Sequence, residues 1–194
     1  MKTRDLTQLL RLAIDERKDF CVEETELYLE EAEKSYPQIK VVTEHIIAKY
    51  CSSKRNAEHE YDITKKAFKA GVCVPHPCAV IAYQSKQETK WYFAMERAPG
   101  IRISELSKNK KAHSLELCKQ EIDKILDLGI IPYDDPINLN EQNAVYNPKT
   151  DKICLIDVSL WDELSLRDEA AKLKIADYRA NVKAELQRKR ILYS

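Results

Sequence analysis

The fold is decided by residues 126–161, which read LDLGIIPYDDPINLNEQNAVYNPKTDKICLIDVSLW. An apolar triplet follows Asn143, and a second apolar run, residues 153–156, leads directly into Asp157. Because an Asn-Pro turn separates the two runs, the pattern predicts a β-hairpin. The hairpin would hold Asn143 and Asp157 side by side, and their oxygens are suitable ligands for Mg²⁺. The alternative is a surface hairpin with ordinary turn residues.

The composition is typical of a globular protein with one domain or two small lobes that share a core. The chain has 194 residues, of which 44% are hydrophobic, and it carries 32 basic and 32 acidic side chains. This balance provides no net field to attract nucleic acid, so we expect no nucleic-acid partner. No apolar segment is long enough to span a bilayer, and residues 1–20 lack the apolar core of a secretory signal.

The cysteines show no spacing typical of metal ligands, and they therefore indicate reduced thiols in a cytoplasmic setting. They are Cys21, Cys51, Cys73, Cys78, Cys118 and Cys154.

The first half of the chain predicts a small antiparallel sheet with two helices. Apolar residues at helical spacing and a closing Gly71 predict the helices, and β-branched runs predict the strands. The expected elements are a helix at 3–18, strands at 19–22, 26–31 and 40–50, a helix at 56–70, and a hairpin at 79–83 and 90–95.

The second half predicts a reduced helical lobe. Residues 96–100 break the strand pattern and are expected to link the two lobes. A helix at 114–128 with Ser114 as its N-cap follows, and after Asp157 most of the chain is a charged helix at 165–190.

Lys49 ends a β-branched strand, and Glu60 lies in the helix that follows it. A strand lysine and a helix glutamate in this order can form the ion pair that positions nucleotide phosphates. The alternative is two solvated charges.

Taken together, these elements resemble a minimal protein kinase, which implies an α+β, two-lobed fold with a truncated C-lobe. The resemblance implies an N-lobe at 1–95, a hinge at 96–100 and a reduced C-lobe at 101–194. It assigns Lys49 and Glu60 to the phosphate-orienting ion pair, Met95 to the gatekeeper, Glu96 and Ala98 to the adenine-facing hinge backbone, and Asn143 and Asp157 to the metal.

The chain is most similar to the small type III secreted effector kinases of enterobacteria, the OspG and NleH group. The segments that carry the likeness are YFAMERAPGIRISEL, IIPYD and NAVYNPKTDKICLID. A weaker likeness, in AEHEYDITKKAFKAGVCVP, is to the small kinase of the KEOPS tRNA-modifying complex.

The sequence departs from the kinase pattern at the phosphate loop and after the metal-binding aspartate. No glycine precedes Gly71, and residues 22–26 read VEETE where a glycine-rich loop is expected. Side chains there hinder close backbone approach, and the carboxylates repel phosphate. Asp157 is followed by Val158-Ser159 in place of the usual Phe-Gly, a change that weighs less because these effectors tolerate a missing glycine there.

The catalytic loop admits two registers. In the first, Pro132-Tyr133-Asp134 replaces His-Arg-Asp, and Asp134 lies nine residues before Asn143 where five are expected. In the second, residues 136–138 occupy the motif and restore the spacing, but Asn138 then replaces the base and cannot usefully accept a proton. We favour Asp134, because the apolar pair Ile130-Ile131 leads into it as an apolar run leads into the catalytic aspartate of the effector kinases that the chain resembles.

The resemblance implies an ATP- and Mg²⁺-dependent kinase that acts on Ser or Thr of a protein after secretion into a host cell cytosol. It also implies a protein partner, ubiquitin or a ubiquitin-conjugating enzyme. The alternative function is a catalytically inactive pseudokinase that serves as a protein-binding module, and a third interpretation is a globular domain unrelated to kinases.

Overall fold

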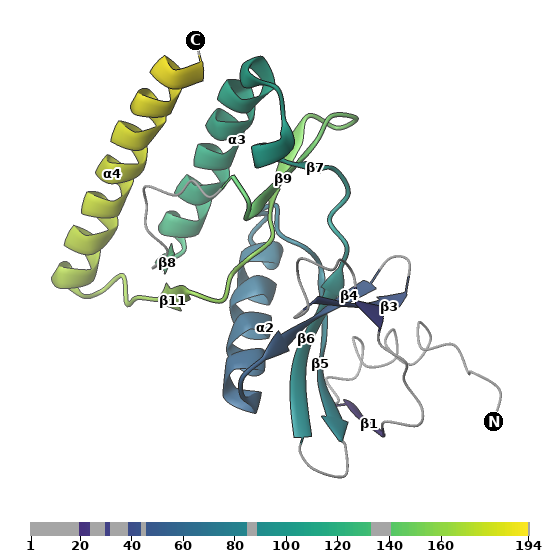
Figure 1. Ribbon diagram of the computed structural model, residues 1–194. Coiled ribbons are helices and arrows are strands. Elements are labelled where there is room, and N and C mark those ends of the chain that lie inside the picture. The colour runs from purple at the N-terminus through teal and green to yellow at the C-terminus, as the bar shows by residue number, and fades with distance from the viewer. Residues whose placement is uncertain are drawn as a thin grey trace. The chain divides into compact units, whose positions relative to one another are not determined.

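The computed structural model describes residues 20–23, 30–31, 39–43, 46–84, 89–132 and 141–193 of the chain (Figure 1). The chain is a mixed α+β protein, as predicted, and it divides into two compact units. The first unit contains the described residues up to Lys65 together with His76–Arg97, and the second contains Lys66–Pro75 and everything from Ala98 onward. The boundary after Arg97 falls inside the predicted linker, but residues 66–75, predicted within the first lobe, belong to the second unit.

The first unit is built on a six-stranded sheet with the strand order β1-β5-β6-β4-β3-β2. Each neighbouring pair is antiparallel, as predicted, except β1 and β5, which run parallel. The strands are β1 (Phe20–Glu23), β2 (Glu30–Glu31), β3 (Ile39–Thr43), β4 (Ile46–Cys51), β5 (Pro77–Gln84) and β6 (Thr89–Glu96).

The single strand predicted at 40–50 is in fact two strands, β3 and β4, which pair antiparallel. In the sequence, the polar residues Glu44 and His45 separate two apolar runs. The prediction followed the alternation of side chains across these two positions and therefore treated both runs as one strand. The helix predicted at 3–18 and most of the strand predicted at 26–31 lie outside the described residues.

Helix α2 (Lys54–Lys69) follows β4 and confirms the predicted helix at 56–70, with its start two residues earlier. Its N-terminal turn is capped by Ser53, whose hydroxyl accepts a hydrogen bond from the Asn56 amide at 3.2 Å. Gly71 ends it with a φ of +79°, the left-handed conformation that glycine adopts readily. In the first unit a core cluster joins α2 to the sheet through Cys51, Ala57, Val80, Phe93 and Met95.

The second unit contains two small sheets and two long helices. One sheet has the order β10-β9-β7, and the other pairs β8 with β11. The elements are β7 (Ile101–Arg102), a 3-10 turn (Ile103–Glu105), α3 (Lys108–Asp127), β8 (Ile130–Pro132), β9 (Ala144–Asn147), β10 (Lys152–Leu155), β11 (Trp161–Glu163) and α4 (Glu169–Tyr193).

Helix α3 begins six residues before the predicted start, so the assignment of Ser114 as its N-cap was wrong. The N-cap is Ser107, and Ser114 is fully buried inside the helix. The first turns of α3 read KNKKAH, which is polar, and apolar periodicity therefore could not reveal them. The C-terminal helix begins at Glu169, four residues after the predicted position, because the Asp168 side chain caps it by accepting from the Ala170 amide at 3.0 Å.

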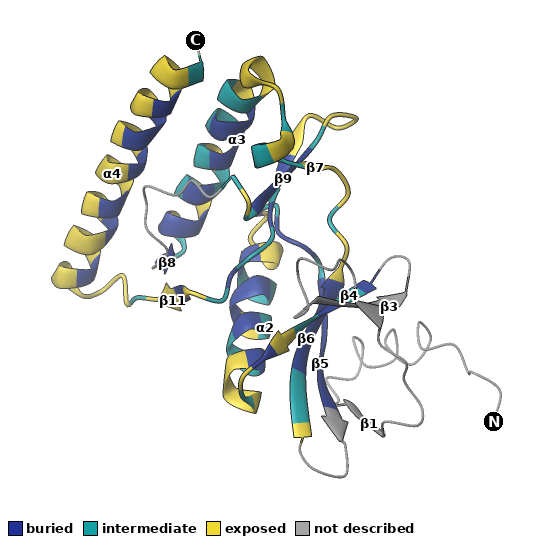
Figure 2. Cartoon of the chain, in the orientation of Figure 1, coloured by how far each residue is buried: buried dark blue, intermediate teal, exposed yellow. Residues whose placement is uncertain are grey.

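Helices α3 and α4 each bury one face and expose the other (Figure 2). Along α4 the apolar residues Ile175, Val182 and Leu186 are buried, while two of its arginines reach α3. Arg179 pairs with Asp127 at 2.7 Å, and Arg190 pairs with Glu116. Among the described helices, none is long and apolar enough to cross a membrane.

Gly100 is the position where a side chain is least tolerated. Its φ is +139°, and an added Cβ would lie 2.3 Å from the Tyr146 carbonyl oxygen and 2.8 Å from Val145, both in β9. Gly71 also has a positive φ, but an added Cβ there meets nothing within 4 Å. A substitution at Gly71 therefore tests backbone strain alone, and a substitution at Gly100 tests backbone strain together with a steric clash.

We predict that Gly100→Ala destabilises the protein more than Gly71→Ala does. Gly71→Ala should cost about 1 kcal/mol for the left-handed backbone alone, whereas Gly100→Ala adds a backbone clash and should cost roughly 3 kcal/mol or more. Urea unfolding followed by circular dichroism measures both. Equal losses for the two variants would contradict the close approach of Gly100 to β9.

Candidate functional site

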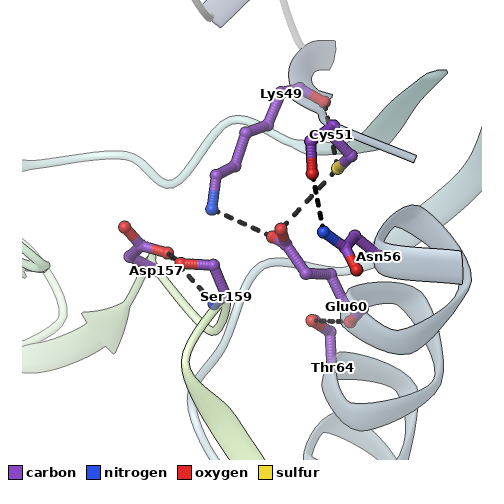
Figure 3. Close-up of polar contacts among 8 residues, drawn as sticks. Lys49, Cys51, Asn56, Glu60, Thr64, Asp157 and Ser159 are labelled. Carbon is purple, nitrogen blue, oxygen red and sulfur yellow. Dashed lines mark hydrogen bonds and ion pairs between the residues drawn. The ribbon is translucent and has the colours of Figure 1, made fainter. Parts of the chain in front are cut away.

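Lys49 and Glu60 form a buried ion pair inside the first unit (Figure 3). Lys49 lies in β4, in register with Phe93 of β6, and Glu60 lies on α2. The Lys49 Nζ donates to Glu60 Oε2 at 3.0 Å, and the two side chains are 13% and 6% exposed. The pair is therefore formed and largely shielded from water, and the alternative of two solvated charges is excluded.

The second oxygen of Glu60 also has a donor. The Cys51 thiol lies 3.6 Å from Glu60 Oε1, and burial together with the Glu60 charge raises the pKa of this thiol to about 12. Cys51 consequently stays protonated and acts as a donor at neutral pH. One turn further along α2, the Thr64 hydroxyl donates to the Glu60 carbonyl at 2.6 Å. The Thr64 bond is to the helix backbone, and the contacts of Lys49 and Cys51 fix the carboxylate toward β4.

The predicted hairpin is present in the second unit as β9 and β10, with Ala144 opposite Leu155. One residue beyond this pair, the Ile156 amide donates to the Asn143 carbonyl at 2.9 Å. Asn143 therefore lies beside the strand end that leads into Asp157, as the sequence predicted. Both residues are half-buried.

The Asp157 carboxylate is oriented by Ser159, two residues further along the chain (Figure 3). Asp157 Oδ1 accepts from the Ser159 amide at 3.1 Å and from the Ser159 hydroxyl at 2.8 Å. Val158 between them is buried and anchors the turn. The Val158-Ser159 sequence, which looked like a departure from the kinase pattern, thus supplies two donors that hold the aspartate in one rotamer.

The proposed hinge residues fall on either side of the boundary between the units. Met95 is 4% exposed and belongs to the core cluster of the first unit. The Glu96 amide already donates to the His76 carbonyl at 3.0 Å, so a flat heterocycle could use only the Glu96 carbonyl, as an acceptor. Ala98 is half-buried and belongs to the second unit.

The structure thus brings together two of the predicted pairs, Lys49 with Glu60 and Asn143 with Asp157. Asp134 and the rival base Asn138 lie outside the described residues. Within the described parts of the chain, no group of three or more His, Cys, Asp or Glu side chains could hold a metal by itself. An asparagine with one oriented carboxylate fits Mg²⁺ of the kind that takes its remaining ligands from water and nucleotide phosphates.

Sequence patterns did not reveal a half-buried polar cluster around Glu141. Lys111 of α3 and Lys189 of α4 donate to its carboxylate at 3.1 and 3.2 Å, and Tyr193 of α4 also donates to it. Burial opposes ionisation of Glu141, but the donors prevail and lower its pKa. Burial and the bond to Glu141 raise the pKa of Tyr193 to about 12. Lys189 and Tyr193 lie one turn apart on α4, but Lys111 and Glu141 are at least 48 positions away from them in sequence, so the sequence carries no signal that brings the cluster together.

A second missed contact holds the β9–β10 turn against α3. Asp151 has a φ of +51°, and its Oδ1 accepts from the Tyr146 hydroxyl at 2.9 Å and lies 2.8 Å from His113 Nε2. These two hydrogen bonds lower the pKa of Asp151. The contacts stabilise the turn from two sides.

No model of a known protein family matches the chain. No curated protein matches it either.

We predict that the Lys49–Glu60 pair is strongly coupled. Lys49→Met should lower the free energy of unfolding by about 3 kcal/mol, because it leaves a buried carboxylate without its counter-charge. Glu60→Gln should cost less, and the double variant should be more stable than the two single losses together predict. Urea unfolding of the four proteins gives the coupling energy.

The matched control is Lys54 with Glu58, an exposed pair at 3.4 Å on the same helix. Its coupling energy should be below about 0.5 kcal/mol. Additive losses at Lys49 and Glu60 would show that the buried pair does not form.

Proposed function

We propose that the chain has a protein kinase-like, two-lobed fold and transfers phosphate from ATP, with Mg²⁺, to Ser or Thr of a protein. The observation that carries this proposal is the buried Lys49–Glu60 ion pair between strand β4 and helix α2. A strand lysine held by a glutamate on the following helix is the arrangement that orients the nucleotide phosphates in protein kinases.

The energetics of the pair favour a functional role. Moving two charges out of water costs several kcal/mol per ion, and apolar replacements of similar size are often as stable or more so. The stability that the buried pair provides is therefore too small to explain why Lys49 and Glu60 occupy these positions, and a function explains them better. Lys49 retains 13% exposure of its side chain, compared with 6% for Glu60, so the lysine is the less shielded member of the pair.

The second unit supplies the metal ligands in this proposal. Asn143 offers an amide oxygen, and Asp157 offers a carboxylate whose rotamer is fixed by Ser159. Mg²⁺ prefers one or two such oxygen ligands together with phosphates and water. The metal would neutralise charge on the transferring phosphoryl group, and Asp134 would orient or deprotonate the acceptor hydroxyl.

The resemblance to the effector kinases supports the remaining parts of the proposal. The acceptor would be a host protein reached after secretion into the host cytosol, and ubiquitin or a ubiquitin-conjugating enzyme would be the partner. One observation favours the inactive alternative: residues 22–26 carry three glutamates and no glycine where the phosphates would lie. Nucleotide binding should accordingly be weak.

We predict that MgATP at about ten times its dissociation constant stabilises the protein by about 1.4 kcal/mol. The thermal midpoint should then rise by roughly 3–5 °C, and the rise should require Mg²⁺. Asp157→Ala should remove the Mg²⁺ dependence, whereas Asp177→Ala, at an exposed position on α4, should leave it unchanged. Identical melting of wild type and Asp157→Ala with and without MgATP would refute the metal assignment.

The second prediction on function distinguishes the two catalytic-loop registers. If Asp134 acts on the hydroxyl, Asp134→Asn should lower phosphotransfer by roughly 10²–10⁴-fold while nucleotide binding survives. If Asn138 occupies that position, Asp134→Asn should change little and Asn138→Asp should raise the rate. Autophosphorylation and substrate labelling, with a ubiquitin-loaded partner present, measure both. Nucleotide binding without phosphotransfer in all three proteins would favour the pseudokinase.

A further inference from the structure

Two cysteines that are 81 positions apart in sequence lie side by side in the second unit. Cys73 belongs to the extended connector that follows Gly71, and its carbonyl accepts from the Leu155 amide of β10 at 2.9 Å. Its own amide donates to Glu121 Oε2 of α3 at 2.8 Å. Cys154 precedes Leu155 in β10, so the backbone contact places the two cysteines next to each other. Both are half-buried free thiols.

Cys73 lines a cavity of about 450 Å³ that lies entirely within the second unit. Phe68 and Gly71 at the end of α2 form one part of its wall. Lys124 and Lys152 form another part, together with the acidic side chains of Glu121 and Asp151. The cavity therefore gives small molecules from solvent access to Cys73, whereas Cys154 does not line it.

The two thiols differ in their readiness to ionise. The hydrogen bond with Cys154 lowers the pKa of Cys73 to about 7; burial and Glu121 oppose this effect, and Lys152 and Lys124 support it. The same hydrogen bond and burial raise the pKa of Cys154. By contrast, burial raises the pKa values of three other thiols, Cys51, Cys78 and Cys118, to about 12.

We propose that Cys73 and Cys154 form a peroxide-reactive modification site, in which Cys73 is the attacking thiol and Cys154 the resolving thiol. The geometry that supports this is the backbone contact between the connector and β10, together with the cavity that is lined by Cys73 and not by Cys154. The site requires neither a nucleotide nor a metal.

The chemistry takes place in two steps with hydrogen peroxide as the oxidant. The Cys73 thiolate attacks one peroxide oxygen, the O–O bond breaks, and the products are a sulfenic acid on Cys73 and hydroxide, which takes up a proton to become water. The Cys154 sulfur then attacks the Cys73 sulfur as its thiol proton leaves, and the departing hydroxide takes up a proton to form a second water. Two thiols are oxidised to one disulfide, and one peroxide is reduced to two waters.

The disulfide would join the connector to β10 covalently. Its formation needs an approach of two sulfurs that a hydrogen bond already holds together. The Leu155 amide and Glu121 hold the Cys73 backbone beside β10.

The first experiment measures the pH dependence of iodoacetamide labelling of Cys73 in the full chain. Every protein in this experiment carries Cys21→Ala and Cys78→Ala. Cys21 is removed because its side chain lies outside the described ones, and Cys78 is removed because it shares a tryptic peptide with Cys73. The labelling rate should be half-maximal near pH 7, and Cys154→Ala, which removes the hydrogen-bond donor, should move that midpoint up toward the ordinary value of 9.0. The control variant Cys118→Ala should leave it unchanged. A midpoint near 9 before Cys154 is changed, or one that Cys154→Ala does not move, would overturn the proposal.

The second experiment treats the full chain with hydrogen peroxide and maps the products by mass spectrometry without reduction. The expected products are a protein that has lost two hydrogens and a linked pair of peptides containing Cys73 and Cys154, both reversed by dithiothreitol. In Cys154→Ser the sulfenic acid should persist on Cys73 and react with dimedone, and in Cys73→Ser neither product should form. A different disulfide in wild-type protein, or oxidation spread equally over the cysteines, would count against the assignment even if the variants were unstable.

Discussion

A buried carboxylate needs a hydrogen-bond donor for each oxygen, and the first unit meets this need at Glu60. Lys49 serves one oxygen and Cys51 the other, and both donors come from strand β4. Loss of Lys49 would remove the counter-charge of this carboxylate, and loss of Cys51 would remove the donor to its other oxygen, so the position of α2 on the sheet is tied to the register of a single strand. The candidate site depends on this constraint, because the same contacts that hold α2 also aim the Lys49 ammonium group.

The second unit obeys the same rule at Glu141. Its donors, Lys111, Lys189 and Tyr193, come from both long helices, and the Glu141 carbonyl accepts from the Ser104 amide at 3.0 Å. One carboxylate therefore fixes α3, α4 and the chain that enters β9. The apolar faces of α3 and α4 determine which sides of the two helices pack together. The hydrogen bonds to Glu141 determine where along their length the helices meet. Each unit thus combines an apolar core with a carboxylate whose two oxygens both have donors: Glu60 is buried, and Glu141 is half-buried.

Local signals predicted the parts of the fold that depend on neighbouring residues. The β9–β10 hairpin, the helix closed by Gly71, and the side-by-side position of Asn143 and Asp157 followed from turn residues and apolar runs. The sequence prediction missed the division of the strand at 40–50 and the early start of α3. The polar pair between the two strands and the polar first turn of α3 contribute no pattern of apolar residues from which either could be predicted. The parallel pairing of β1 with β5 and the meeting of Cys73 with Cys154 depend on contacts between distant segments. The patterns of a single sequence do not reveal which distant segments come together.

The turn at Asp151 has a consequence for how this sequence can vary. The residue there must adopt a left-handed backbone and also present an acceptor to Tyr146 and His113. Glycine satisfies the first requirement but has no side chain, and glutamate could supply an acceptor but is strained in that conformation. Aspartate and asparagine alone suit both. Evolutionary drift at this exposed position should therefore be confined to these two residues, although exposure by itself would suggest free variation.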